Sequence, residues 1–415
     1  MADGYVDTSG GGPLASQTPR LRRVLGVWGL SLYGLGTIVG AGIYVLVGEV
    51  AAYAGEGLVL AFAVAGLLAG LTGLSYAALS SRFPRIAGVA LFVHAGFGSA
   101  DLARAAGLLV CLTGVVSAAT ITRGFVGYLN VFLSAPAIPV MVLLVLAVTG
   151  LAAWGIRQAA GVIVTVTVLE VAGLIYVVWA GLHGIGRPIG LETAVDIPAT
   201  GILLGAFIAF YAFIGFEDMV NIAEEVKQPE RTMPRGILAA VIMACVLYMV
   251  VAMVSQRTLP PEALAASDAP LAALMTETGR SALPISVIGM VAVVNGALVQ
   301  IIMASRLLYG MASGGLAPRW LARVHPRTRT PIPATLLVAG CVLAFALWLP
   351  LGTLAELTSF IILFVFVLVN ASLWRLQGGA DWRGRGGFDT PRWVPVAGTL
   401  TCAGILAVRV VTLKY

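Results

Sequence analysis

Gly34, Gly36, Gly40 and Gly42 interrupt the first long apolar segment of this 415-residue chain. Irregular backbone is tolerated at membrane depth only where protein or a cavity surrounds it, because lipid satisfies no hydrogen bonds. The free amides at a break in a helix favour an anion such as a carboxylate. The glycines therefore predict an anion site in the middle of the membrane, although glycines at this spacing are also typical of close helix packing.

In another apolar segment, 199–222, polar residues appear before the segment should have crossed the membrane. If its outer half is a helix that ends near Tyr211 to Gly215, the last carbonyls of that helix are free to accept hydrogen bonds from an ammonium group. Phe210 and Phe213 stand where aromatic rings would cover a bound molecule, and packing against lipid or other helices is their alternative role. Amides for an anion and carbonyls for a cation together suit a zwitterion such as an amino acid.

The composition is that of a protein that crosses a membrane several times. Hydrophobic residues make up 59% of the chain and charged residues 11%, whereas soluble domains carry about 25% charged residues. The formal net charge of +6 comes from arginines that lie between apolar segments, so it indicates membrane topology rather than nucleic-acid binding. All cysteines lie in apolar runs without C-x-x-C spacing, and we expect no metal site, disulfide or cofactor.

Eleven apolar segments are long enough to span about 30 Å of hydrocarbon. They lie at 25–52, 57–80, 102–130, 137–155, 159–182, 199–222, 235–256, 283–311, 332–350, 353–375 and 393–413. Basic residues are concentrated on one side of these segments, which predicts a cytosolic N-terminus and, with an odd number of spans, a C-terminus outside. The sequence thus predicts an all-α polytopic protein of the cytoplasmic (inner) membrane.

The first ten segments divide into two sets of five, and each set opens with an interrupted segment. Matching interruptions in two halves are the best sequence sign of a transporter site, and five spans per half place the second half in inverted orientation. The predicted organisation is a disordered cytosolic tail (1–23), a first repeat (24–183), an outer loop (184–198), a second repeat (199–376), a cytosolic loop (377–392) and a last helix (393–415).

Two motifs resemble those of the amino acid–polyamine–organocation (APC) superfamily permeases. Gly36-x-x-x-Gly40-Ala41-Gly42-Ile43-Tyr44 is similar to the G-x-G-I-F stretch of that family. The run E-E-V-K-Q-P-E-R-T-M-P, which ends at Pro234, is similar to its E-E-V-K-N-P-x-R-x-x-P signature. The resemblance implies a LeuT-type five-plus-five inverted repeat with helices 1 and 6 broken. The family usually has twelve helices, whereas this chain has eleven predicted segments. It would therefore carry one additional helix after the ten helices of the repeats.

The resemblance also implies how an amino acid would bind. The substrate carboxylate is expected on backbone amides of the first break, the amino group on carbonyls of both breaks, and Tyr211 at the aromatic gate. The residues expected to bind substrate are Ile38, Gly40, Ala41, Gly42, Ile43, Phe210, Tyr211, Phe213 and Ile214.

Glu170 lies in the middle of the segment 159–182, where a charged side chain costs about 2.5 to 3.5 kcal/mol on insertion scales. Burial disfavours the charged form of a lone carboxyl, so we hypothesise that Glu170 binds and releases a coupling proton. A structural acid, neutral or paired with arginine, is the alternative. Several proton-coupled members of the family have a lysine at the similar position, so their mechanism does not transfer unchanged.

Glu217 and Asn295 are further candidates for an ion or gate site within apolar segments. Glu217 follows the second break and fits a structural tie to neighbouring helices equally well. Asn295 fits a helix-to-helix hydrogen bond equally well. The sequence has no cluster of Asp, Ser and Thr that argues strongly for sodium.

Together these patterns predict a secondary active transporter and no catalytic residues. Proton-coupled symport of amino acids by alternating access is favoured, with neutral amino acids as substrates, and an amino acid or amine exchanger of the same fold is the alternative. A membrane-embedded enzyme would need convergent His, Asp or Ser residues, and a channel a repeated filter or charged ring, and the sequence has neither pattern. The oligomeric state is left open.

Overall fold

The computed structural model describes residues 23–412 except 24, 84–87, 155–159, 185–197, 316, 380–381 and 383–385. Positions 41, 160–163 and 224 are described by their backbone alone. The predicted tail (1–23) and outer loop (184–198) therefore lie almost entirely outside the described residues, and the predicted cytosolic loop (377–392) lies partly outside them.

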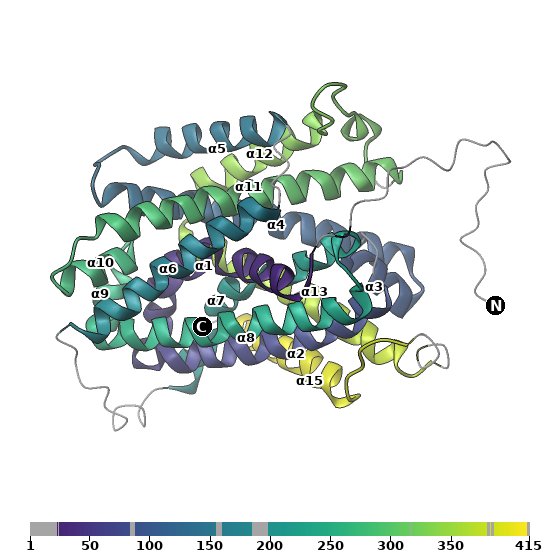
Figure 1. Ribbon diagram of the computed structural model, residues 1–415, viewed down its shortest axis with the longest axis horizontal. Coiled ribbons are helices and arrows are strands. Elements are labelled where there is room, and N and C mark those ends of the chain that lie inside the picture. The colour runs from purple at the N-terminus through teal and green to yellow at the C-terminus, as the bar shows by residue number, and fades with distance from the viewer. Residues whose placement is uncertain are drawn as a thin grey trace.

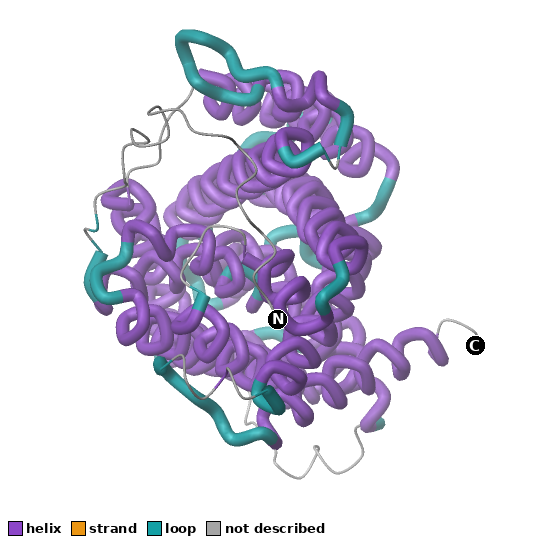
Figure 2. The backbone as a smooth tube through the Cα atoms, turned by 90° about the vertical axis from the view of Figure 1, so that its right-hand side faces the viewer, coloured by secondary structure: helices purple, strands orange, loops and turns teal. Residues whose placement is uncertain are grey.

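Helices make up nearly all of the described chain, with short loops between them (Figure 2). Figure 1 labels them in chain order. The α-helices are α1 (Val27–Ala54), α2 (Leu58–Arg82), α3 (Gly88–Phe97), α4 (Ala100–Asn130), α5 (Ala137–Trp154), α6 (Ala160–Leu182), α7 (Ala199–Ala209), α8 (Pro229–Thr258), α9 (Pro261–Ala265), α10 (Pro270–Glu277), α11 (Leu283–Ser313), α12 (Ile332–Trp348), α13 (Leu351–Leu376) and α15 (Trp393–Thr412). Two 3₁₀ helices, η3 (Phe210–Phe213) and η4 (Phe216–Glu225), follow α7. The prediction of an all-α membrane protein is confirmed.

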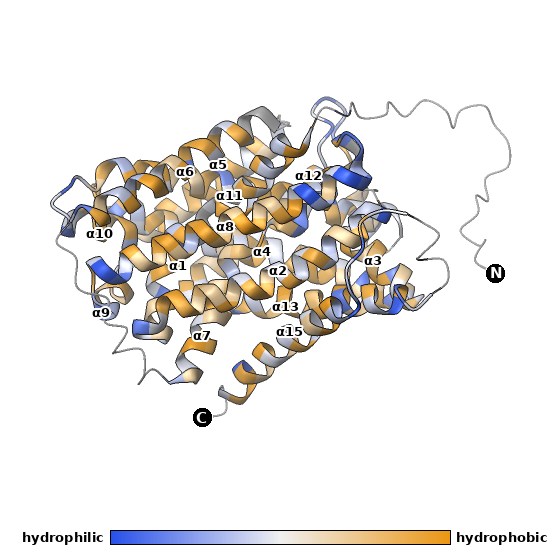
Figure 3. Ribbon diagram, turned by 60° about the horizontal axis from the view of Figure 1, so that its bottom comes forward, coloured by the Kyte–Doolittle hydropathy of each residue, from blue (hydrophilic) through white to orange (hydrophobic). Residues whose placement is uncertain are grey.

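Each of the eleven predicted segments coincides with a helix or, for 199–222, with α7 and the 3₁₀ helices after it. Nine helical stretches within the described residues are long and apolar enough to cross a membrane. Apolar residues cover the length of the long helices, and hydrophilic residues gather at their ends (Figure 3). The part of α1 up to Gly40 and the 17-residue α12 are shorter, so the number of eleven spans stays a prediction.

Four helices of the first predicted repeat (α1, α2, α4 and α5) have their main neighbours in the second, and α6 packs mainly against α1. The first helix, α1, packs against α6, α7, α8 and α11 in the interior of the bundle. Helix α2 packs against α7 and α8, and α4 packs against α11 and α13. The last helix, α15, packs on α13 and α2 at one side of the molecule (Figure 1). The two halves therefore share one core, and α15 packs at its edge with Cys402, Ile405 and Leu406.

Both predicted breaks are present. Within α1, Gly40 leaves helical geometry with φ 9° and ψ −145°. After α7 the chain tightens into η3, and Ile214 is extended. Gly215 then adopts φ 131°, a conformation that favours glycine. Each half of the protein thus opens with an interrupted helix.

The two breaks lie directly against each other. A Cβ atom built on Gly42 would lie 2.7 Å from the Cα atom of Ala212, and one built on Gly215 would lie 2.3 Å from the carbonyl oxygen of Thr37. Backbone fills the space where these side chains would stand. Glycine at both positions is therefore required for the close approach of α1 to η3 and to the turn before η4.

We predict that Gly42→Ala destabilises the protein, because the added methyl group meets the backbone of η3. Overpacking of this kind costs about 1 to 3 kcal/mol. The matched control is Gly70→Ala in α2, where an added Cβ meets nothing within 4 Å. Thermal melting of the detergent-purified variants is the measurement. Equal melting temperatures for the two variants would contradict the close approach.

Candidate functional site

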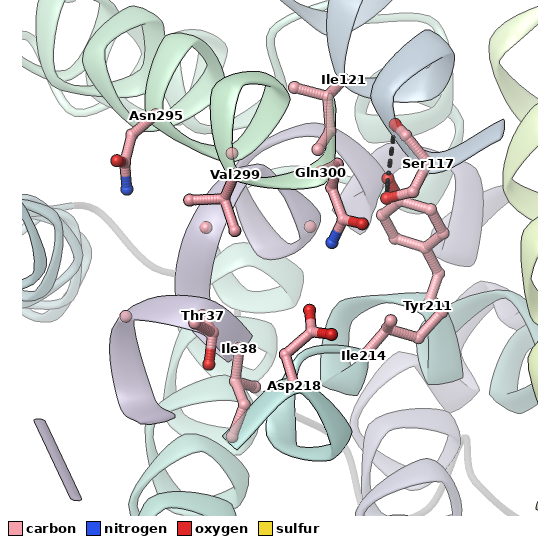
Figure 4. Close-up of a pocket in the computed structure, with 14 residues that line it drawn as sticks. Thr37, Ile38, Ser117, Ile121, Tyr211, Ile214, Asp218, Asn295, Val299 and Gln300 are labelled. Atoms are coloured by element: carbon pink, nitrogen blue, oxygen red, sulfur yellow. Dashed lines mark hydrogen bonds between the residues drawn. The ribbon is translucent and has the colours of Figure 1, made fainter. Parts of the chain in front are cut away.

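A cavity lies where the two breaks face α4 and α11 (Figure 4). It holds about 530 Å³ of empty space, the open space at its mouth included. The residues that line it are Gly36, Thr37, Ile38, Gly40, Gly42, Ser117, Ile121, Tyr211, Ile214, Asp218, Asn295, Gly296, Val299 and Gln300.

Backbone amides of α1 are available on one side of the cavity. Because Gly40 is not helical, the residues after it begin a new helical stretch whose first N–H groups lack partners within that stretch. Gly40 and Gly42 line the cavity, and a Cβ on Gly40 would meet nothing within 4 Å. Ile43 is fully buried and does not line the cavity, and Ala41 is described by its backbone alone.

A tyrosine on α8 connects the carbonyls of the two breaks. The Tyr248 hydroxyl lies 2.8 Å from the carbonyl oxygen of Ile38 and 2.9 Å from that of Ala212. A hydroxyl has one hydrogen, so it donates fully to only one of these oxygens at a time. The Tyr211 carbonyl accepts from the backbone N–H of Ile214 at 3.1 Å. Two carbonyls expected to bind an amino group thus already have protein donors.

Of the three predicted aromatic residues, Tyr211 reaches the cavity wall. Its hydroxyl lies 2.9 Å from the hydroxyl of Ser117 on α4, at the opposite side of the cavity from Asn295 (Figure 4). Phe210 and Phe213 are fully buried and do not line the cavity. Their rings pack against other aromatic rings, with the Phe213 and Tyr248 centroids 5.0 Å apart.

Glu170 is fully buried on α6 and does not line the cavity. Neither of its carboxyl oxygens has a well-formed hydrogen bond within the described part of the chain. The side chain of Asn295, which does line the cavity, interacts with the carboxyl group of Glu170. The Tyr44 hydroxyl donates to the backbone oxygen of Glu170 at 2.5 Å and joins the part of α1 after Gly40 to α6. Asn295 therefore connects Glu170 to the cavity.

The two acids after the second break have different surroundings. The Glu217 carboxylate accepts a hydrogen bond from the backbone N–H of Gly215 at 2.8 Å and closes the turn. Asp218 lines the cavity, although the sequence reasoning did not select it. Asp218 directly follows Glu217 after the second break, and this position was the available signal.

The other lining residues that the sequence reasoning missed come mainly from α4 and α11. Ser117, Ile121, Val299 and Gln300 have no distinctive motif. They face the cavity because of how α4 and α11 pack on α1, and a single sequence does not reveal that packing.

Two broken helices that meet at a cavity inside a polytopic bundle define a membrane transporter. The family model described as amino acid permease matches residues 25–413, and the chain belongs to this family. The resemblance to APC permeases is thereby confirmed.

Several known proteins are similar to the chain over most of its length. An uncharacterized transporter of Mycobacterium tuberculosis is 33% identical over 386 residues, which are 92% of this chain and 85% of that protein. The branched-chain amino acid permease BcaP of Bacillus subtilis is 29% identical over 378 residues, 85% and 80% of the two chains. The vacuolar cationic amino acid transporter 4 of Arabidopsis thaliana is 29% identical over 381 residues, 84% and 62%.

We predict that Tyr248→Phe lowers both the stability of the protein and its affinity for substrate, because two buried carbonyls lose their shared donor. Stranding buried polar groups costs about 1 to 3 kcal/mol. Tyr76→Phe is the matched control, since the buried Tyr76 hydroxyl has no hydrogen-bond partner among the described residues. That control should be neutral or stabilising in thermal melting. A Tyr248→Phe protein that melts like the Tyr76→Phe protein would show that the hydroxyl does not hold the breaks.

Proposed function

We propose that this protein is a secondary active transporter that carries amino acids across the cytoplasmic (inner) membrane by alternating access. The observation that supports this most is the meeting of the two breaks at one cavity, with amides on one side and carbonyls on the other. In this proposal the N-terminus is cytosolic and the C-terminus lies outside. The substrate is a zwitterion held by its shared α-groups.

In the proposed complex the substrate carboxylate binds the amides that follow Gly40. The ammonium group binds near the carbonyls of Ile38 and Ile214, which both line the cavity. When the ammonium occupies the Ile38 oxygen, the single Tyr248 hydrogen turns to Ala212. Both carbonyls then have a full donor when substrate is bound, whereas without substrate they share the one Tyr248 hydrogen.

Neutral side chains are the proposed first substrate class. Ile121 on α4 and Val299 on α11 line the cavity opposite the breaks and offer apolar contact. The name of the similar BcaP protein, a branched-chain amino acid permease, agrees with such a substrate.

Proton coupling is proposed to act through Glu170 and Asn295. An asparagine amide has both a carbonyl acceptor and an NH₂ donor. It therefore has a suitable partner group for a protonated Glu170, which donates, and for an ionised one, which accepts. Because Asn295 also lines the cavity, a change in its orientation on protonation of Glu170 would change its contacts with a bound substrate.

We predict that leucine raises the melting temperature of the purified protein, since a ligand that binds only the folded state stabilises it. Leucinamide lacks the carboxylate, and 2-hydroxyisocaproate lacks the ammonium group, so neither should stabilise the protein at the same concentration. Stabilisation by all three compounds would contradict the proposed recognition of both α-groups. A screen in which no amino acid stabilises the protein would contradict the proposed function itself.

We predict that Glu170→Gln reduces pH-gradient-driven uptake of leucine into proteoliposomes to the level without a gradient. Exchange of internal for external leucine should continue, because it needs no net proton movement. The control is Asp101→Asn, which removes an exposed carboxylate that pairs with Arg104 on the surface of α4. Full gradient-driven uptake by Glu170→Gln would overturn the role of this residue. Wild-type uptake that needs internal amino acid instead of a gradient would favour the exchanger.

A further inference from the structure

Asp218 provides the one carboxylate among the described residues that line the cavity, and these include no lysine, arginine or histidine. Its side chain is buried, with 8% of the residue exposed. The hydrogen bonds and ion pairs found within the described part of the chain do not include its carboxylate. An ammonium or guanidinium group is the natural complement of a carboxylate that faces a cavity.

The neighbouring acid already performs the local structural task. The Glu217 carboxylate accepts from Gly215 N–H and closes the turn between η3 and η4. The backbone N–H of Asp218 donates to the carbonyl of Gly215 at 3.1 Å, a bond that any residue at this position can make. The fold of η4 therefore does not depend on the Asp218 side chain.

The Asp218 carboxyl group points into the cavity and toward the side-chain amide of Gln300 on α11 (Figure 4). The α-groups of the substrate are proposed to bind at the break in α1 and at the break between α7 and η4. A substrate side chain then extends toward α4 and α11, past Ile121 and Val299. Asp218 lies on the side of the breaks, beside Ile38 and Ile214, and its carboxyl group and the Gln300 amide face each other across this space (Figure 4).

We infer that Asp218 is a specificity-determining residue that binds a positively charged group at the end of the substrate side chain. Amino acids with cationic side chains are then substrates in addition to neutral ones. A lysine side chain has an apolar stem and a charged tip. The stem lies along Ile121 and Val299, and the ammonium group donates to the Asp218 carboxylate and the Gln300 side-chain oxygen. The inference rests on the proposed function for the placement of the α-groups.

The test compares lysine with norleucine, which has the same four-carbon stem without the ammonium group. Binding to the wild-type protein, Asp218→Asn and Asp218→Glu is measured by isothermal titration calorimetry in detergent. The wild-type protein should bind lysine at least as tightly as norleucine. Asp218→Asn should weaken lysine binding by about tenfold or more, the usual scale for a lost charge-assisted hydrogen bond, and leave norleucine affinity within about threefold.

Two further variants separate recognition from folding. Asp218→Glu keeps the charge and should retain the preference for lysine over norleucine that Asp218→Asn loses. Asp101→Asn removes an exposed carboxylate and should change neither affinity. If Asp218→Asn does not fold, the wild-type comparison of the two ligands and the Asp218→Glu protein still decide.

Three results would overturn the inference. They are equal losses for lysine and norleucine in Asp218→Asn, an unchanged lysine affinity in that variant, and a wild-type protein that binds norleucine but not lysine. The last result leaves the proposed function intact. A wild-type protein that binds no amino acid contradicts the proposed function instead, so the two failures are distinguishable.

Discussion

The bundle has to satisfy the backbone of two broken helices in an interior that has little water. The Tyr248 hydroxyl is central to this, because it stands 2.8 Å from the Ile38 carbonyl and 2.9 Å from the Ala212 carbonyl. A buried carbonyl without a donor would favour the return of either segment to a regular helix. Such a return would remove the amides and carbonyls that face the cavity. One side chain of α8 thus supports both halves of the candidate site.

Backbone hydrogen bonds also join the residues just before α1 to those at the end of η4. Leu25, just before α1, pairs with Val226 after η4: its N–H donates to the Glu225 carbonyl at 3.1 Å, and its carbonyl accepts from Lys227 at 2.9 Å. At the level of the breaks, Thr37 Oγ1 lies 3.1 Å from the carbonyl oxygen of Gly215. These contacts run between the two predicted repeats. They favour movement of the first part of α1 and of η4 as one unit.

The sequence predicted the fold well, since apolar length, matching glycine-rich interruptions and the E-E-V-K motif are all local patterns. Both breaks are where the glycines predicted them, at Gly40 and Gly215. Of the residues predicted to bind substrate, Ile38, Gly40 and Tyr211 line the candidate cavity, whereas Phe210 lies in an aromatic cluster behind it. Tyr248 and Gln300 were not predicted, because their roles depend on which face α8 and α11 turn toward α1, and no motif in one sequence records that.

Glu170 and Asp218 illustrate why depth in the membrane alone does not assign a role to an acid. Both are buried, yet Glu170 lies behind the cavity wall and meets Asn295, while Asp218 stands on the wall itself. A proton on Glu170 changes the charge of the protein without occupying the space in which a substrate binds. A cation at Asp218 must enter that space. If Glu170 carries the coupling proton and Asp218 binds the substrate side chain, coupling and selectivity are set by different residues. Selectivity among amino acids can then vary through the cavity wall while the proton site on α6 stays the same.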